Sequence, residues 1–110
     1  MAFNGKWSYI IKGQKMENGH IKDNNITHSF NIIQSGNKLQ ILSLNNKNYG
    51  IGTLFCFGDI ITLNIQLKFS NYILNINVYP VCGNNKLIGY YNGTFGSDIE
   101  SGSIIITRNL

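Results

Sequence analysis

The chain has 110 residues, of which 43% are hydrophobic and only 13% are charged, and its formal net charge at pH 7 is +4. A chain of this length is expected to form one domain. Its high hydrophobic and low charged content excludes an intrinsically disordered protein. No apolar run approaches the roughly 18 residues of a membrane-spanning helix, and no basic-then-apolar leader opens the sequence. We therefore expect one cytoplasmic domain over residues 1–110, with no membrane among its partners.

The positive charge comes from eight lysines and one arginine that are spread along the chain. A nucleic-acid-binding surface would cluster such residues on one face and interleave them with aromatic side chains. Scattered lysines are instead typical of a solvated surface that keeps an apolar protein soluble. We therefore expect no nucleic-acid partner.

Period-two alternation of apolar and polar residues predicts strands through most of the chain. The clearest case is residues 61–69, where every odd position is apolar and every even position is polar. Successive side chains of a strand point to opposite faces, so the odd positions are expected to be buried and the even ones to face water. In chain order we expect eight strands, at residues 6–12, 27–34, 38–44, 49–57, 60–68, 72–80, 86–94 and 102–108.

Short connections with turn residues, such as Gly58-Asp59 and Ser70-Asn71, predict that each strand pairs antiparallel with the next. The longest connection, around residues 13–26, is expected to be a loop. A meander of eight strands hides its edges by closing on itself. The predicted fold class is all-β, a single antiparallel up-and-down eight-stranded β-barrel.

The two ends of the chain carry the most specific pattern. Gly5-Lys6-Trp7 opens the first predicted strand, and Arg108 closes the last. This pattern resembles the calycin superfamily of lipocalins, fatty-acid-binding proteins and avidins. The resemblance implies a lipocalin-like barrel in which Arg108 stacks on Trp7 and closes one end, a contact that desolvation strengthens. Trp7 is the only tryptophan, so an avidin-like biotin site lined by several tryptophans is not expected.

A barrel of about eight strands is either filled by side chains or holds one small ligand. Alternation turns several aromatic residues and hydroxyls inward, a mixture typical of small-molecule sites. The alternative is a solidly packed core whose tyrosine hydroxyls bond to backbone. We expect a non-enzymatic protein that binds a small, largely apolar molecule. The candidate ligand-binding residues are Tyr9, Phe30, Thr53, Phe55, Phe57, Tyr72 and Tyr91.

The sequence contains none of the common catalytic or metal-binding motifs: no nucleophile elbow, phosphate loop, Cys-x-x-Cys or His-x-x-x-His. Cys56 and Cys82 are expected to be reduced thiols. We therefore expect no enzymatic activity, no cofactor and no metal.

The alternative function is binding of another protein. The chain resembles, in size and topology, compact lipocalin-like barrels that act as cytoplasmic inhibitors of bacterial cysteine proteases. Loops on a rigid sheet are common recognition sites, and an exposed apolar patch marks a partner surface or a homodimer interface. The predicted outward apolar residues are Ile33, Leu54, Tyr79, Ile88, Tyr90 and Ile105.

Overall fold

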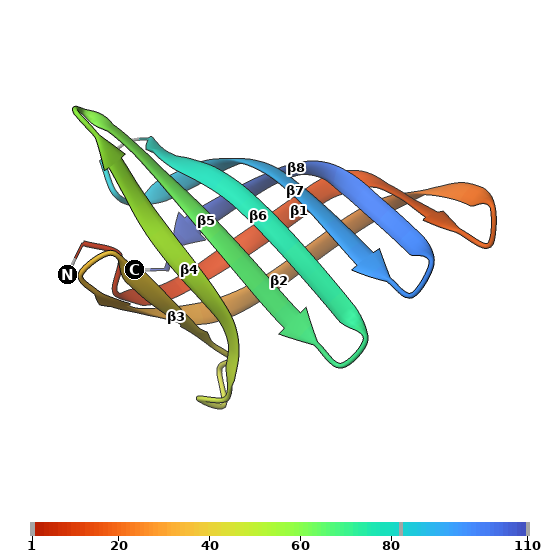
Figure 1. Ribbon diagram of the computed structural model, residues 1–110, viewed down its shortest axis with the longest axis horizontal. Helices are drawn as coiled ribbons and strands as arrows, with labels where there is room; N and C mark the ends of the chain where they lie inside the picture. Colours follow the sequence, from red (N-terminus) through yellow and green to blue (C-terminus); the bar gives the residue numbers. More distant parts are fainter. Residues whose placement is uncertain (1, 82, 110) are drawn as a thin grey trace.

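The computed structural model describes residues 2–81 and 83–109, and it is built from eight strands (Figure 1). They are β1 (Gly5–Glu17), β2 (His20–Ser35), β3 (Lys38–Leu42), β4 (Asn48–Phe57), β5 (Ile60–Phe69), β6 (Tyr72–Val81), β7 (Lys86–Phe95) and β8 (Asp98–Arg108). Each strand pairs antiparallel with the next, and β8 pairs with β1, so the sheet closes into a barrel. The predicted all-β, up-and-down, eight-stranded fold class is confirmed. Across the described ranges, no helix has the length and apolar character needed to cross a membrane.

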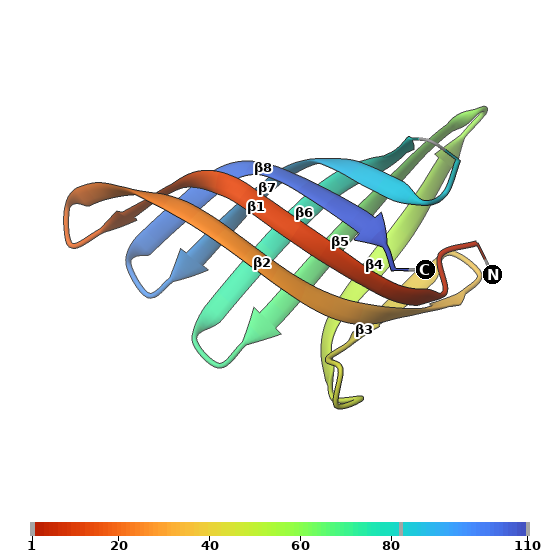
Figure 2. The ribbon, with the colours of Figure 1, turned by 180° about the vertical axis from the view of Figure 1, so that it is seen from behind.

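The predicted loop at residues 13–26 was wrong, because β1 and β2 continue through it as one long hairpin. Their ladder runs to the pair Glu17 and His20, and the hairpin projects beyond the other strands (Figures 1 and 2). Asn18 and Gly19 both have positive φ, 53° and 79°, as a two-residue type I′ turn requires. Polar residues on both faces of this projecting segment hid the alternation that marks the other strands. β8 likewise begins at Asp98 rather than at residue 102.

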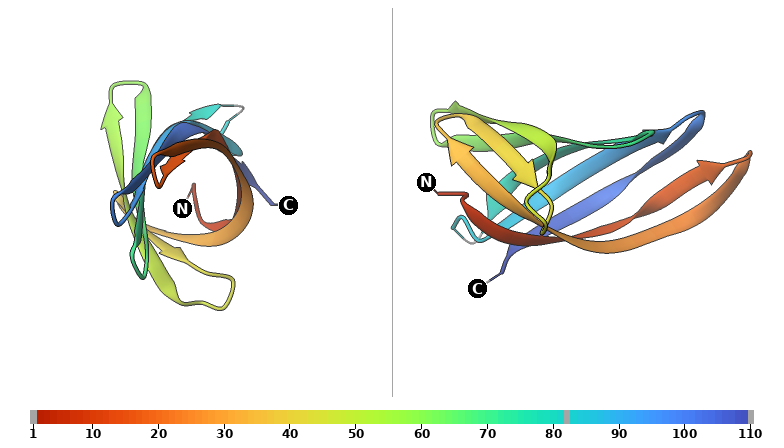
Figure 3. Two further views of the ribbon diagram at one scale, coloured as in Figure 1. Left: turned by 90° about the vertical axis from the view of Figure 1, so that its right-hand side faces the viewer. Right: turned by 90° about the horizontal axis from the view of Figure 1, so that it is seen from below.

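The two ends of the barrel differ. Both termini lie near one end, together with the β2–β3, β4–β5 and β6–β7 turns; we call this the closed end (Figure 1). The other four connections lie at the opposite end, which we call the open end. Figure 3 shows the ring of strands viewed from the side on which the β1–β2 hairpin projects.

Trp7 and Arg108 pack together at the closed end. The Arg108 guanidinium carbon lies 4.2 Å from the centroid of the fully buried Trp7 ring, and the Trp7 Nε1 donates to the Phe3 carbonyl oxygen at 3.0 Å. The guanidinium also donates to the carbonyl oxygens of Ala2, Asn4 and Asn84. One side chain therefore ties the N-terminal segment and the β6–β7 turn to the tryptophan.

The core fills the barrel from this end. In β5 the predicted alternation is confirmed, since Leu63, Ile65 and Leu67 are buried and the polar residues between them are exposed. The same pattern recurs in other strands. The buried hydrophobic residues are Phe3, Trp7, Tyr9, Ile11, Phe30, Ile32, Leu39, Ile41, Leu63, Ile65, Leu67, Leu74, Ile76, Val78, Leu87, Tyr91, Ile104 and Ile106.

The orientation predicted for β4 was wrong. From Ile51 onward its odd-numbered residues face outward, and Phe55 and Phe57 are 56% and 85% exposed. Gly50, Gly52 and Leu54 face the core instead, so the outward orientation predicted for Leu54 was also wrong.

Neighbouring strands explain why glycines occupy the inner face of β4. A Cβ atom at Gly50 would lie 2.6 Å from Leu67 Cδ2 and 2.9 Å from the Gln66 carbonyl oxygen. At Gly52 it would lie 3.1 Å from both Leu39 and Ile65. Side chains of β3 and β5 already fill the space at these two positions, so neither can carry a larger residue without a shift of its neighbours.

Replacing Trp7 with alanine is expected to lower the free energy of unfolding by about 3–5 kcal/mol, as for other buried large-to-small changes. The loss of the ring also removes the surface on which Arg108 lies. Urea denaturation followed by circular dichroism measures this change. A near-neutral effect would show that the closed end does not depend on Trp7.

The orientation of β4 predicts opposite results for adjacent residues. Gly50→Ala places a Cβ against Leu67 and backbone, and overpacking of this kind costs about 1–3 kcal/mol. Ile51→Ala removes an exposed side chain and is expected to change stability by less than about 0.5 kcal/mol. Denaturation of the two variants under the same conditions gives the comparison. A larger loss for Ile51→Ala would reverse the assignment of the two faces.

Candidate functional site

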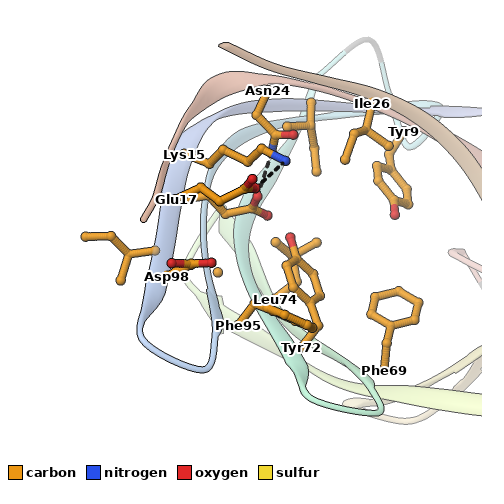
Figure 4. A pocket seen from close by; sticks show the side chains of 14 residues that line it. Tyr9, Lys15, Glu17, Asn24, Ile26, Phe69, Tyr72, Leu74, Phe95 and Asp98 are labelled. Atoms are coloured by element: carbon orange, nitrogen blue, oxygen red, sulfur yellow. Dashed lines mark hydrogen bonds and ion pairs between the residues drawn. The ribbon is translucent and has the colours of Figure 1, made fainter. Parts of the chain in front are cut away.

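The open end of the barrel contains a cavity of about 470 Å³ (Figure 4). This volume lies within the range of roughly 300–1,000 Å³ found for small-molecule sites. The cavity is bounded by β1, β2 and the four strands from β5 to β8. Its lining residues are Tyr9, Ile11, Lys15, Glu17, Asn24, Ile26, Phe69, Tyr72, Leu74, Gly93, Phe95, Asp98, Ile99 and Glu100.

Apolar and aromatic side chains form most of the walls. Ile11 and Leu74 are buried, and the Phe69 and Tyr72 rings lie 5.7 Å apart between centroids. In Figure 4 the hydroxyl ends of Tyr9 and Tyr72 point into the space between them. The cavity therefore combines a mainly apolar surface with a few hydroxyl groups.

Asn24 organises the polar side of the cavity. Its side chain is only 5% exposed, and its Nδ2 donates to Glu100 Oε2 at 2.7 Å and to Tyr91 Oη at 3.4 Å. These bonds join β2, β7 and β8. The second carboxylate oxygen of Glu100, Oε1, is buried and has no hydrogen-bond partner among the described residues.

Burial dominates the electrostatics of the inner groups. It raises the pKa of Glu100, against smaller lowering effects from the Lys15 charge and the Asn24 hydrogen bond. Burial also raises the pKa of the Tyr9 hydroxyl. The same cause raises the pKa of Tyr49, whose ring centroid lies 5.0 Å from that of Phe69, to about 12. All three groups are thus less readily ionised than in water.

The rim of the cavity carries most of its charge. Lys15 Nζ lies 3.3 Å from a Glu17 carboxylate oxygen, and Lys22 Nζ lies 3.5 Å from the other (Figure 4 shows the first pair). The hydrogen bond with Lys15, followed by the charges of both lysines, lowers the pKa of Glu17. Lys15 is therefore already paired at the rim.

The structure brings together only part of the set predicted to bind a ligand. Tyr9 and Tyr72 line the cavity, whereas Tyr91 lies behind it and contacts Asn24. Phe30 lies in the core next to Tyr9, with ring centroids 5.5 Å apart. The inward orientation predicted for the remaining three residues was wrong, because Thr53, Phe55 and Phe57 face outward on β4.

Sequence reasoning missed the polar residues of the cavity, because they lie in the extended parts of β1, β2 and β8. Lys15, Asn24 and Glu100 all fall in segments that were expected to be connections. Asn18-Gly19 was the available signal, since Asn-Gly is a strong indicator of a tight hairpin. Extending the two strands from that turn would have placed Asn24 opposite Gly13.

Other chemistry-bearing residues lie apart from this site. Cys56 is exposed on β4, and Cys82 lies outside the described residues. Within the part of the chain that the structure describes, no three His, Cys, Asp or Glu side chains are placed to hold a metal ion.

The chain matches no protein-family model and no curated protein sequence.

The raised pKa of Glu100 predicts a pH-dependent stability. The folded state binds this proton more tightly than the unfolded state, so ionising Glu100 costs stability at pH values above its folded pKa. Glu100→Gln removes that cost and keeps an oxygen for Asn24, so it is expected to raise stability at pH 7. The advantage should vanish as the pH falls below 4.5, the ordinary pKa of the group.

Glu17→Gln is the matched control, because the pKa of Glu17 is lowered rather than raised. Removing the Glu17 carboxylate should leave stability at pH 7 unchanged or slightly reduced. Thermal unfolding of both variants from pH 3.5 to pH 8 makes the comparison. A Glu100→Gln variant that is less stable than the parent at pH 7 would show that the carboxylate contributes to folding.

Proposed function

We propose that this protein is a non-enzymatic binding protein that takes up a small, largely apolar molecule in the cavity at the open end. The observation that carries this proposal is the cavity itself, about 470 Å³ of space in a barrel whose closed end is filled by side chains. A barrel of eight strands has room for one small ligand.

The walls suit an apolar occupant. Ile11 and Leu74 lie buried in the lining, and aromatic rings from β1, β5 and β6 border the same space. Burying apolar surface there contributes roughly 25 cal/mol per Å². The few hydroxyl and carboxylate groups fix the orientation of a ligand and provide specificity.

The rim supports the same function. Ile26, Phe95 and Ile99 line the cavity and are 41%, 53% and 55% exposed. A ligand seated in the cavity would cover part of this apolar surface. These residues lie on strands or directly beside tight turns, so the site is largely preformed and loses little entropy on binding.

Tyr72→Ala is expected to weaken binding of N-phenyl-1-naphthylamine, a neutral apolar fluorophore, by about tenfold, which corresponds to about 1.4 kcal/mol. The reason is the loss of an aromatic wall that contacts Phe69. Fluorescence titration measures the dissociation constants. Tyr90→Ala is the matched control, because Tyr90 is 74% exposed on the outer face. Absence of saturable binding, or an equal loss in both variants, would contradict the proposal.

The alternative, an inhibitor-type barrel that binds another protein, is supported by one feature of the outer face. Four apolar residues lie side by side across neighbouring strands, since the register pairs Tyr79 with Ile88, Ile88 with Ile105, and Ile105 with Ile10. Tyr90 extends this outer row along β7. Contiguous exposed apolar surface of this kind is common at protein interfaces. Ile33 lies on β2, outside this row.

Native mass spectrometry of protein purified from its own host separates the two functions. A bound small-molecule mass that is lost on denaturation supports the cavity. A co-purifying polypeptide that Ile88→Asp removes, with fluorophore binding unchanged, supports the outer row instead.

A further inference from the structure

Only one of the two carboxylate oxygens of Glu100 has a hydrogen-bond partner among the described residues. Oε2 accepts the hydrogen bond from Asn24, and Oε1 is buried in the lining with no partner among the described residues. An ionised carboxylate can accept several hydrogen bonds, and leaving a buried acceptor unpaired is costly. Oε1 is therefore the atom in this cavity with the greatest unmet capacity to bind a donor.

Gly93 lies directly against that oxygen. It lies opposite Glu100 in the β7–β8 ladder, and a Cβ atom there would be 2.9 Å from Glu100 Oε1 and 3.1 Å from Tyr72 Oη. Glu100 Oε1 and Tyr72 Oη therefore both lie close to Gly93, where a side chain would collide with them. Both oxygens can accept a hydrogen bond from one ligand nitrogen.

The walls near this point favour a positive charge on that nitrogen. Aromatic rings attract cations through their faces, and Tyr9, Phe69 and Tyr72 border the same cavity. The lining residues include three carboxylates and one ammonium, a formal charge of −2 in a chain of net charge +4. Counting Lys22, which pairs with Glu17 at the rim, the local charge is −1.

Other ligand classes fit this arrangement less well. A carboxylic acid would place a second negative charge beside Glu100, and like charges in one site repel strongly. A neutral apolar molecule would displace solvent and leave Oε1 unpaired. The lining ammonium of Lys15 is less available to pair with a ligand carboxylate, because it already lies 3.3 Å from Glu17.

We propose that the preferred ligand is an organic amine with an aromatic or aliphatic body, whose protonated amino group binds Glu100 Oε1 and Tyr72 Oη at the edge of the cavity beside Gly93. This inference rests on the proposed binding function of the same cavity. The apolar body occupies the aromatic part of the cavity, and Asn24 holds the carboxylate in place from behind.

Three indoles that differ in one terminal group test the inference: tryptamine, which is cationic, tryptophol, which is neutral, and indole-3-acetate, which is anionic. We expect isothermal titration calorimetry at pH 7 to give at least tenfold tighter binding of tryptamine than of tryptophol, and the weakest binding of indole-3-acetate. Phenethylamine and 2-phenylethanol repeat the comparison with a smaller body.

Glu100→Gln keeps the size of the side chain and removes its charge. It should weaken tryptamine binding much more than tryptophol binding, because only the amine loses an opposite charge. Glu17→Gln removes a carboxylate that the protein already pairs, and it should preserve the preference for the amine.

The outcomes separate this inference from the function on which it rests. Equal or weaker binding of tryptamine relative to tryptophol, or a preference that survives Glu100→Gln, overturns the amine assignment. If the neutral fluorophore still binds in that case, the apolar cavity function stands. If neither the fluorophore nor any indole binds, the proposed function fails as well.

Discussion

The pairing of β1 with β8 is the constraint on which both ends of the molecule depend. One ladder runs from Trp7 opposite Arg108 at the closed end to Lys15 opposite Glu100 beside the cavity. Gly13 forms part of this seam, and a Cβ atom there would lie 2.4 Å from Tyr91 Oη. The missing side chain lets Tyr91 lie across the seam. The contact that closes the barrel therefore also sets the position of the polar groups in the cavity.

The division into a packed half and a hollow half follows from the inward-facing residues of the same strands. Toward the closed end, β1 carries Trp7 and Tyr9, which are among the largest side chains of the core. Toward the open end, the small or polar residues that line the cavity include Asn24, Gly93 and Glu100. Interiors are close-packed where side-chain volume suffices. A cavity forms where the inward residues become small or polar and solvent can enter.

The fold could be predicted from local alternation. The site could not, because alternation reveals neither the orientation of β4 nor the burial of a polar residue in the projecting hairpin. In β5 the residues around Ile65 are apolar on one face alone, so the pattern has one interpretation. In β4 the glycines at 50 and 52 make the inner face less hydrophobic than the outer one, and the choice depends on Leu67 and other residues distant in sequence. Asn24 was missed because a polar residue in a projecting hairpin carries no signal of burial. Its contact with Glu100 spans 76 positions along the chain.

The same residues would link the stability of the protein to the proposed selectivity for amines. Burial of Glu100 raises its pKa, which means that the folded protein holds an ionised carboxylate at a cost, and one hydrogen bond from Asn24 offsets only part of it. A ligand ammonium would supply the missing donor and the opposite charge at once, and its binding would stabilise the fold by mass action. Destabilising polar groups are commonly retained where they recognise a ligand. The proposed selectivity for amines therefore requires no additional residue, only the carboxylate whose second oxygen has no partner among the described residues.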